Sequence, residues 1–173
     1  CIRDSSRADH MGMLATVMNA LALCDVFEQN GVDARVMTSV PMHGFGEAFS
    51  KEEAVRHLND GCVVIFGCGT GNPYFTTDTA GVLKALEIDA EAILLAKNID
   101  GVYSADPNKD PGAVKYDTIT YDEMLAKHLA VMDTAATSMA MENNLPVEVF
   151  ALKDPQNIVR VVCGHKIGTS VTN

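Results

Sequence analysis

The sequence predicts an α/β fold in which a mainly parallel sheet lies between layers of helices. Short apolar runs alternate with segments of helical periodicity along the chain, as they do in β-α-β units. Two of these runs, Cys62–Phe66 and Ala92–Ala96, contain only apolar residues, which is typical of strands buried on both faces. Several helical segments also begin at a residue type that caps helix N-termini. In such folds ligands bind beyond the carboxyl ends of the strands, so the loops that follow strands are the first candidates for a site.

Three helices and two strands are expected in the first half of the chain. A long helix over Asp9–Gln29 is predicted by apolar residues at helical spacing and by the stop signal Asn30-Gly31. Ser50 and Glu53 have the spacing of a capping box, which opens the second helix. The third helix spans about Asp78 to Glu87. The two strands are expected at Ala34–Val40 and Cys62–Phe66.

The second half of the chain is expected to hold three more helices and three more strands. Thr120 and Glu123 form another capping box, which opens a helix that runs to Lys127. Asp133 is expected to cap the next helix, and Asp154-Pro155 has the pattern of a third helix start. The remaining segments are a long polar loop at Asn98–Thr118 and strands at Ala92–Ala96, Val147–Leu152 and Gly168–Thr172.

The composition argues against two classes of partner. The chain has 173 residues, with 13 Lys and Arg against 23 Asp and Glu, so its net charge is −10. A nucleic acid is held largely by Lys and Arg that neutralise its phosphates, so no nucleic acid is expected as a partner. No uninterrupted apolar run reaches the ~18 residues of a membrane span, and no signal peptide is recognisable. A membrane is therefore not expected as a partner either.

The cysteines and histidines predict neither a disulfide nor a metal site. The 5 cysteines form no C-x-x-C pair. The 5 histidines lack the i, i+4 spacing of two histidine ligands on one helix. Reduced cysteines are typical of a reducing compartment, so the expected location is the cytoplasm.

The loop Gly67–Thr77 is the strongest candidate for a ligand site. It follows a predicted buried strand, and glycines at positions 67, 69 and 71 allow a ligand to approach the backbone closely. Thr76 and Thr77 stand where the next helix begins, and a helix N-terminus attracts anions. The alternative is a flexible turn capped by threonine. The loop lacks the Lys-Ser/Thr of a Walker A motif, and Pro73 replaces the third glycine of a Rossmann fingerprint.

A second candidate is the loop Lys97–Pro107, which follows the strand Ala92–Ala96. Lys97 and Tyr103 would form the rim of a nucleotide site, in contact with a phosphate and stacked on a base. The alternative is that the loop is only a connector made of two turns.

Four aspartates lie near predicted strand ends or helix starts. Helix capping and turn formation are their ordinary roles. If they share a cleft with phosphates, a cation must lie between the charges, because two unit charges about 4 Å apart repel by about 4 kcal/mol at an effective dielectric of about 20. These residues are Asp78, Asp100, Asp106 and Asp133.

Five stretches of the chain resemble the bacterial UMP kinases of the amino acid kinase family. They occur in the order of that family and are spread over nearly the whole chain, from Asp9 to Val171. The stretches are Asp9–Leu23 (DHMGMLATVMNALAL), Gly69–Ala80 (GTGNPYFTTDTA), Asn98–Pro111 (NIDGVYSADPNKDP), Val131–Ala136 (VMDTAA) and Gly164–Val171 (GHKIGTSV). The resemblance implies an α/β/α fold and the transfer of the γ-phosphoryl group from ATP·Mg²⁺ to UMP, which gives UDP.

The same resemblance implies roles for individual residues. Asp9 would bind the ribose of UMP. Asp78 and Asp133 would be catalytic, with Asp78 near the reacting phosphates and Asp133 orienting a catalytic lysine. The uracil and the phosphate of UMP would be held by Thr70, Gly71, Asn72, Pro73, Tyr74, Phe75, Thr76 and Thr77. ATP would be contacted by Tyr103, Asp106 and either Lys97 or Asn98.

The resemblance also implies how the chain is organised. Residues 1–87 would be the remainder of the UMP-binding half and residues 88–173 the ATP-binding half, with one continuous sheet through both. The lysine-bearing strand and glycine-rich segments that precede the position of Asp9 in the family are absent from the sequence, so this chain alone is expected to be inactive.

Regulation and assembly are implied in the same way. Family members are usually hexamers regulated by GTP and UTP. Asp25 and Arg35 fall where some members contact GTP, although Cys24 and Glu28 depart from the basic residues found nearby.

Two other functions stay open at the level of the sequence. A kinase of the same family that acts on an amino acid or on carbamate would share the ATP loop and differ at the acceptor site. A non-catalytic nucleotide-sensing module would keep the fold but lack the phosphate-binding loops. Titration with UMP and then with ATP·Mg²⁺ would separate these functions.

Overall fold

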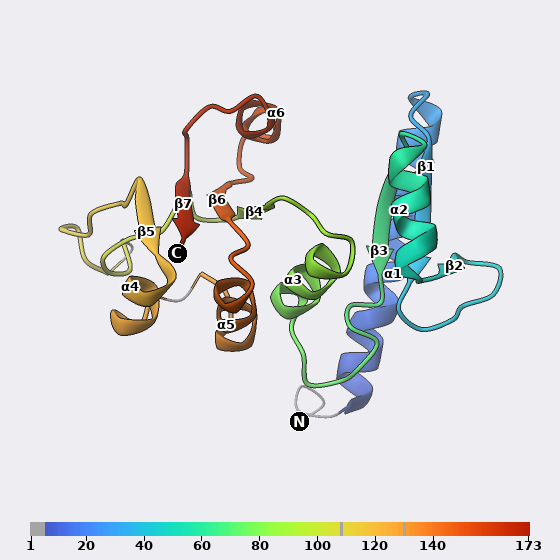
Figure 1. Ribbon diagram of the computed structural model, residues 1–173, viewed down its shortest axis with the longest axis horizontal. Coiled ribbons are helices and arrows are strands. Elements are labelled where there is room, and N and C mark those ends of the chain that lie inside the picture. The colour runs from blue at the N-terminus through green and yellow to red at the C-terminus, as the bar shows by residue number, and fades with distance from the viewer. Residues whose placement is uncertain (1–5, 108, 130) are drawn as a thin grey trace. The chain divides into compact units, whose positions relative to one another are not determined.

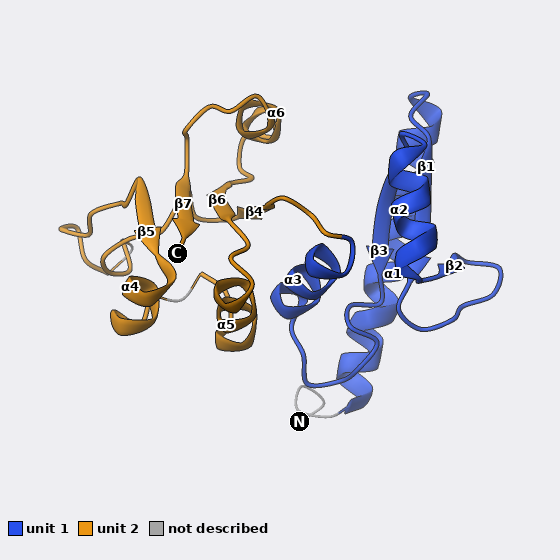
Figure 2. Ribbon diagram, viewed as in Figure 1, with its two compact units in different colours: residues 1–88 blue, residues 89–173 orange. Residues whose placement is uncertain are grey.

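The computed structural model describes residues 6–107, 109–129 and 131–173. The chain divides into two compact units, Cys1–Ile88 and Asp89–Asn173, which are coloured separately in Figure 2. The boundary expected from the sequence, between residues 87 and 88, lies beside this division. The assignment of the two halves to UMP and ATP stays a prediction.

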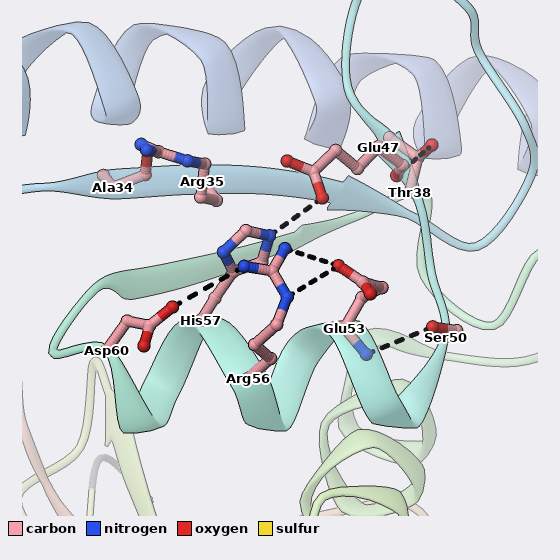
Figure 3. Close-up of polar contacts among 9 residues, drawn as sticks. All are labelled: Ala34, Arg35, Thr38, Glu47, Ser50, Glu53, Arg56, His57 and Asp60. Carbon is pink, nitrogen blue, oxygen red and sulfur yellow. Dashed lines mark hydrogen bonds and ion pairs between the residues drawn. The ribbon is translucent and has the colours of Figure 1, made fainter.

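Unit 1 has a small parallel sheet with helices on both faces. Its elements are α1 (Ser6–Gln29), β1 (Ala34–Thr38), β2 (Glu47–Ala48), α2 (Lys51–Asn59), β3 (Val63–Gly67) and α3 (Thr77–Glu87). The sheet has the strand order β2-β1-β3, and β1 is parallel to both of its neighbours. Figures 1 and 3 show α1 on one face of this sheet and α2 on the other. Met37 of β1 and Ala54 of α2 are fully buried in the core between these layers.

Unit 2 has a mixed sheet of four strands. Its elements are β4 (Ile93–Lys97), β5 (Thr118–Thr120), α4 (Tyr121–Ala126), α5 (Thr134–Glu142), β6 (Val147–Ala151), α6 (Gln156–Val162) and β7 (Thr169–Thr172). The strand order is β4-β6-β7-β5, and only the pairing of β6 with β7 is antiparallel. Val149, Tyr121 and Phe150 are among its most deeply buried side chains. Each unit has a sheet of its own, and the continuous sheet expected from the sequence remains a prediction about how the two join.

β3 and β4 are more exposed than their apolar sequences predict. Both are expected to be buried on both faces, yet the first four residues of β3 are only partly buried and Leu94 of β4 is 42% exposed. The reason is their position, because each is an edge strand of the sheet within its own unit. An edge strand lacks a neighbour on one side and is therefore more open to solvent.

The sequence does not predict β2 and β5, which have only 2 and 3 residues. Strands this short are too brief to show an alternation of apolar and polar residues. They form strands because their backbones pair with longer neighbouring strands. Backbone pairing of Met37 with Glu47 and of Thr38 with Ala48 holds β2 beside β1.

Two of three predicted helix caps are confirmed by hydrogen bonds. Thr120 and Glu123 form both halves of the capping box of α4. The Asp133 carboxylate accepts a hydrogen bond from the backbone N–H of Ala136 at 2.8 Å and caps α5. At the third predicted start the N-cap of α6 is Pro155, with no side-chain cap, although the Asp154 carboxylate accepts a hydrogen bond from the backbone N–H of Gln156 at 3.0 Å. Local sequence therefore predicts these helix starts well.

The capping box predicted at α2 forms only in part. The Ser50 hydroxyl accepts from the backbone N–H of Glu53 at 3.2 Å, as expected. The Glu53 carboxylate instead accepts hydrogen bonds from Arg56 at 2.5 and 3.0 Å. An arginine one turn along the helix competes for this carboxylate with the N-cap backbone.

α1 is the one described helix that is long and apolar enough to cross a membrane by length and composition. A single such helix is weak evidence, because a core helix and a signal sequence pass the same test. Val17 and Ala20 of α1 are buried. Gly67, at the end of β3, lies so close that a Cβ on it would be 3.2 Å from the side chain of Val17. α1 is thus packed as a helix of unit 1.

Candidate functional site

The segment between β3 and α3 is a sharply turned loop. Cys68, Gly69, Gly71 and Tyr74 all have positive φ angles, which range from 57° to 80°. This left-handed conformation is easily adopted by glycine but strained for Cys68 and Tyr74. Strain of this kind persists only where the surrounding structure holds it, and it is frequent at ligand sites.

Two hydroxyl groups hold this loop in place within unit 1. The backbone N–H of Cys68 donates a hydrogen bond to Oγ1 of Thr16 on α1 at 2.9 Å. Oγ of Ser39, just after β1, donates to the carbonyl oxygen of Gly69 at 2.6 Å. The contacts join residues 52 and 30 positions apart in the sequence. Sequence reasoning singled out neither Thr16 nor Ser39, because no local pattern marks a contact of this range.

The loop and the first turns of α1 line a pocket of about 280 Å³. The Asp9 carboxylate on its wall accepts a hydrogen bond from the backbone N–H of Tyr74 at 2.9 Å. Thr76 caps α3 by accepting from the backbone N–H of Thr79 at 3.3 Å, so the N-terminus of α3 lies at this pocket. The pocket thus combines a carboxylate, which accepts hydrogen bonds from hydroxyl groups, with a helix N-terminus, which favours an anion.

Most residues predicted to bind UMP line this pocket, together with others that were not among the predicted UMP ligands. The expected residues on its wall are Asp9, Thr70, Asn72, Phe75, Thr76 and Thr77, and the additional ones are Ala8, Gly12, Met13, Thr16 and Gly69. Among the described residues, Gly71, Pro73 and Tyr74 belong to the same loop but not to the pocket wall. The Tyr74 side chain is 82% exposed. Asp78 follows in the first turn of α3.

Unit 2 has a pocket of about 450 Å³ in the loop after β4. Tyr103 and Asp106 lie on its wall, and Lys127 and His128 line it from the end of α4. Of the residues predicted to bind ATP, Lys97 and Asn98 are outside this wall: Lys97 is the last residue of β4, and Asn98 follows it. Lys127 and His128 are described residues of the pocket that the sequence analysis did not consider.

A hydrogen-bonded group of three side chains fixes one side of this loop. The Tyr103 hydroxyl donates to Asp100 at 2.7 Å, and the Lys115 ammonium group lies 3.3 Å from the other oxygen of the same carboxylate. Burial acts to raise the pKa of Asp100, but the hydrogen bonds from Tyr103 and Lys115 outweigh it and lower that pKa. The same hydrogen bond to Asp100 raises the pKa of Tyr103. Tyr103 is therefore held as a neutral phenol beside an ionised carboxylate.

The two residues predicted to be catalytic lie at helix N-termini in different units. Asp78 is in the first turn of α3, and Asp133 is the N-cap of α5. Because one oxygen of Asp133 accepts from a backbone N–H, the cap fixes the orientation of this carboxylate. Both positions are typical of ordinary capping residues and are also compatible with a role near phosphate.

One of the two residues expected at an effector site lines a pocket, and the effector role of both stays a prediction. Arg35 lines an open pocket of about 600 Å³, together with Cys24, Glu28 and residues of the segment before β2. Asp25 is not part of this wall in the described structure, and its carboxylate accepts a hydrogen bond from Gln29 at 2.7 Å.

Comparison with known proteins identifies the family. Residues 2–151 match the family model described as amino acid kinase family. The chain belongs to the amino acid kinase family. The family and the α/β fold expected from the sequence are thereby confirmed.

Members of this family with close similarity to the chain carry names that agree with one another. The chain is 52% identical over 170 residues to a uridylate kinase of Porphyromonas gingivalis (strain ATCC BAA-308 / W83), a match that covers 98% of this chain and 71% of that protein. The crystal structure of UMP kinase from Bacillus anthracis matches with a TM-score of 0.94 and 37% identity, over 98% of this chain and 70% of that one. The crystal structure of UMP kinase from Ureaplasma parvum matches with a TM-score of 0.94 and 36% identity, over 98% of this chain and 73% of that one.

Proposed function

We propose that this protein is a nucleoside monophosphate kinase that transfers the γ-phosphoryl group of ATP to UMP. The observation that carries the proposal is the pocket of unit 1, where a threonine-rich helix N-terminus and the Asp9 carboxylate line one cavity. UMP has both a phosphate and ribose hydroxyl groups, which suit these two features. The similar proteins named uridylate kinase and UMP kinase support the same reaction.

In this proposal the acceptor nucleotide lies across the pocket of unit 1. Its phosphate binds at the N-terminus of α3, where Thr76 and Thr77 supply hydroxyl groups and the helix dipole favours negative charge. Asp9 accepts hydrogen bonds from the ribose, and its own contact with the loop backbone keeps it oriented. Thr70 and Asn72 line the pocket and are assigned to the uracil. Gly71, Pro73, Tyr74 and Phe75 shape the same loop.

The donor nucleotide is assigned to the pocket of unit 2. Tyr103 offers a ring for contact with the base, held by its hydrogen bond to Asp100. Asp106 lies on the same wall, and its carboxylate is 3.4 Å from the ammonium group of Lys109. Lys97 or Asn98, at the end of β4, contributes a further contact with ATP. Mg²⁺ enters with ATP as part of the substrate, and it neutralises phosphate charge during the transfer.

Positioning and charge stabilisation supply the catalysis. The ionised phosphate of UMP is itself the nucleophile, so the reaction needs no general base. The attacking oxygen of UMP forms a bond to the γ-phosphorus of ATP while the bond to the leaving ADP oxygen breaks. Asp78 and Asp133 act by organising cations around these phosphates.

Assembly and regulation belong to the same proposal. Four apolar side chains of α1 are exposed at helical spacing: Met11 (64%), Leu14 (52%), Met18 (71%) and Leu21 (37%). A stripe of this kind is suited to contact with another protein surface. We assign it to a homo-oligomeric interface, with a hexamer as the expected assembly. The pocket lined by Arg35 is the candidate effector site for GTP or UTP, and the cytoplasm is the expected location.

Calorimetric titration with UMP tests the proposal at its central point. Saturable binding of one UMP per chain, with weaker binding of AMP, is expected. A folded chain that binds no UMP would overturn the proposal. UDP formation from UMP and ATP·Mg²⁺ then tests the reaction. UMP binding without UDP formation would instead assign the protein a nucleotide-sensing role.

A further inference from the structure

Three potential metal ligands converge between β2 and α2, in a cluster that the proposed kinase reaction does not use. Nε2 of His57 and carboxylate oxygens of Glu47 and Glu53 all lie within 4.8 Å of one another. Figure 3 shows Glu47 reaching down from the strand toward His57, with Glu53 on the neighbouring turn of α2. All three residues belong to unit 1, so the cluster is defined within one compact unit.

We propose that Glu47, Glu53 and His57 form a binding site for one divalent first-row transition metal ion, with Zn²⁺ as the representative. One imidazole nitrogen and two carboxylate oxygens are a donor set that such ions accept. The two carboxylates balance the charge of a divalent cation. Three protein ligands leave the remaining coordination position to solvent.

The backbone places these ligands without any rearrangement of the fold. Glu53 and His57 are four residues apart on α2 and therefore face the same side of the helix. Glu47 is fixed by β2, whose backbone pairs with Met37 of β1. A sequence search for paired histidines misses this arrangement, because the second ligand on the helix is a carboxylate and the third comes from a two-residue strand.

His57 is the most buried member of the set. Its side chain is only 7% exposed, and Nε2 lies 2.8 Å from Oε2 of Glu47. The ring is thus already turned toward the other two ligands. The Glu47 and Glu53 side chains are 46% and 49% exposed, which leaves an open path for an ion from solvent. Metal binding would replace the His57–Glu47 hydrogen bond, with Nε2 of His57 as the ligand and the imidazole proton on Nδ1.

Arg56 is the competitor for this site. Its guanidinium donates two hydrogen bonds to the Glu53 carboxylate, and this pairing lowers the pKa of Glu53, so the carboxylate is ionised. A second carboxylate is within reach, since Nη1 of Arg56 lies 3.6 Å from Asp60. Arg56 is half exposed and can pair with Asp60 when a metal ion takes Glu53. Removal of Arg56 should therefore strengthen metal binding.

The test is titration of the chain with Co²⁺ and Zn²⁺. Visible absorption of bound Co²⁺ reports its ligands, and calorimetry with Zn²⁺ gives stoichiometry and affinity. One ion per chain is expected, with no thiolate-to-cobalt charge-transfer band, a band that would indicate cysteine ligands. Absence of stoichiometric binding, or a strong thiolate band, would overturn the proposal.

Substitutions on the exposed side of the site make the test specific without disturbing the core. E47Q and E53Q should each weaken Zn²⁺ binding by about tenfold or more, the scale on which even the partners of metal ligands matter. E52Q is the matched control, because Glu52 is exposed on the same turn of α2 but outside the cluster, and it should leave affinity unchanged. R56Q should tighten binding. If E53Q and E52Q bind Zn²⁺ equally well, the proposed site is wrong.

Discussion

The hydroxyl group of Thr16 accepts a hydrogen bond from the backbone N–H of Cys68 at 2.9 Å, and the same hydroxyl donates to the carbonyl of Met13 at 2.6 Å. This contact joins α1 to the left-handed turn after β3, and both Thr16 and the turn line the pocket assigned to UMP. Thr16, like Asp9, therefore joins α1 to the strained loop.

Replacement of Thr16 by valine should destabilise the loop and weaken UMP binding. Valine keeps the shape but leaves the Cys68 N–H without its partner, which costs about 1–3 kcal/mol in a buried position. Chemical denaturation measures the loss of stability, and calorimetry measures the affinity for UMP. Thr16→Ser retains the hydroxyl and is the control. Its losses of stability and of UMP affinity should be clearly smaller than those of Thr16→Val. If the wild type and T16V have equal stability and equal affinity for UMP, this hydrogen bond contributes to neither.

Asp9→Asn should weaken UMP binding with little effect on the fold. The asparagine carbonyl can still accept the hydrogen bond from the Tyr74 backbone, so the loop keeps its contact. Hydrogen bonds from ribose hydroxyls to a charged group are worth about 1.5–3 kcal/mol, so the Kd for UMP should rise about tenfold or more. Calorimetry measures the change, and inorganic phosphate binding is the internal comparison. Unchanged UMP affinity in D9N would remove Asp9 from the ribose site.

The sequence predicts most helix starts because their causes are local. The caps at Thr120 and Asp133 depend on residues within one turn, and the structure contains both. The glycine-threonine loop is recognisable for the same reason. Thr16 and Ser39 could not be predicted as loop anchors, since their partners are far away in the sequence. The partial exposure of β3 depends on which strands pair, which no single segment encodes.

Asp133→Asn should separate catalysis from stability. Asparagine is about as good an N-cap as aspartate, so the free energy of unfolding should change by less than about 0.5 kcal/mol. In the proposed mechanism the lost charge no longer organises a cation near the phosphates, and kcat for UDP formation should fall about 100-fold or more. A coupled assay of UDP formation measures kcat, and thermal unfolding provides the stability control. Full turnover by D133N would contradict a catalytic role for this residue.

Met18→Lys should break up the proposed homo-oligomer. Met18 is 71% exposed in the apolar stripe of α1, so a lysine there costs the isolated chain little but cannot be buried against a second copy. Light scattering after size-exclusion chromatography should show a smaller species than the wild type at the same concentration. Gln29→Lys, at the polar end of the same helix, is the control. A wild-type protein that is already monomeric would refute the interface.

Asp100→Asn should remove a pH-dependent part of the stability of unit 2. Because the folded pKa of Asp100 is lowered, its ionised form stabilises the fold above the ordinary pKa of an aspartate, and this contribution is lost as pH falls through the lowered value. The wild type should therefore exceed D100N in stability at neutral pH, and the difference should shrink in acid. Without the carboxylate, the pKa of Tyr103 should also fall toward its ordinary value, which ultraviolet titration of the phenol can measure. A stability difference that is constant from neutral to acid pH would show that the ionised carboxylate is not what stabilises this loop.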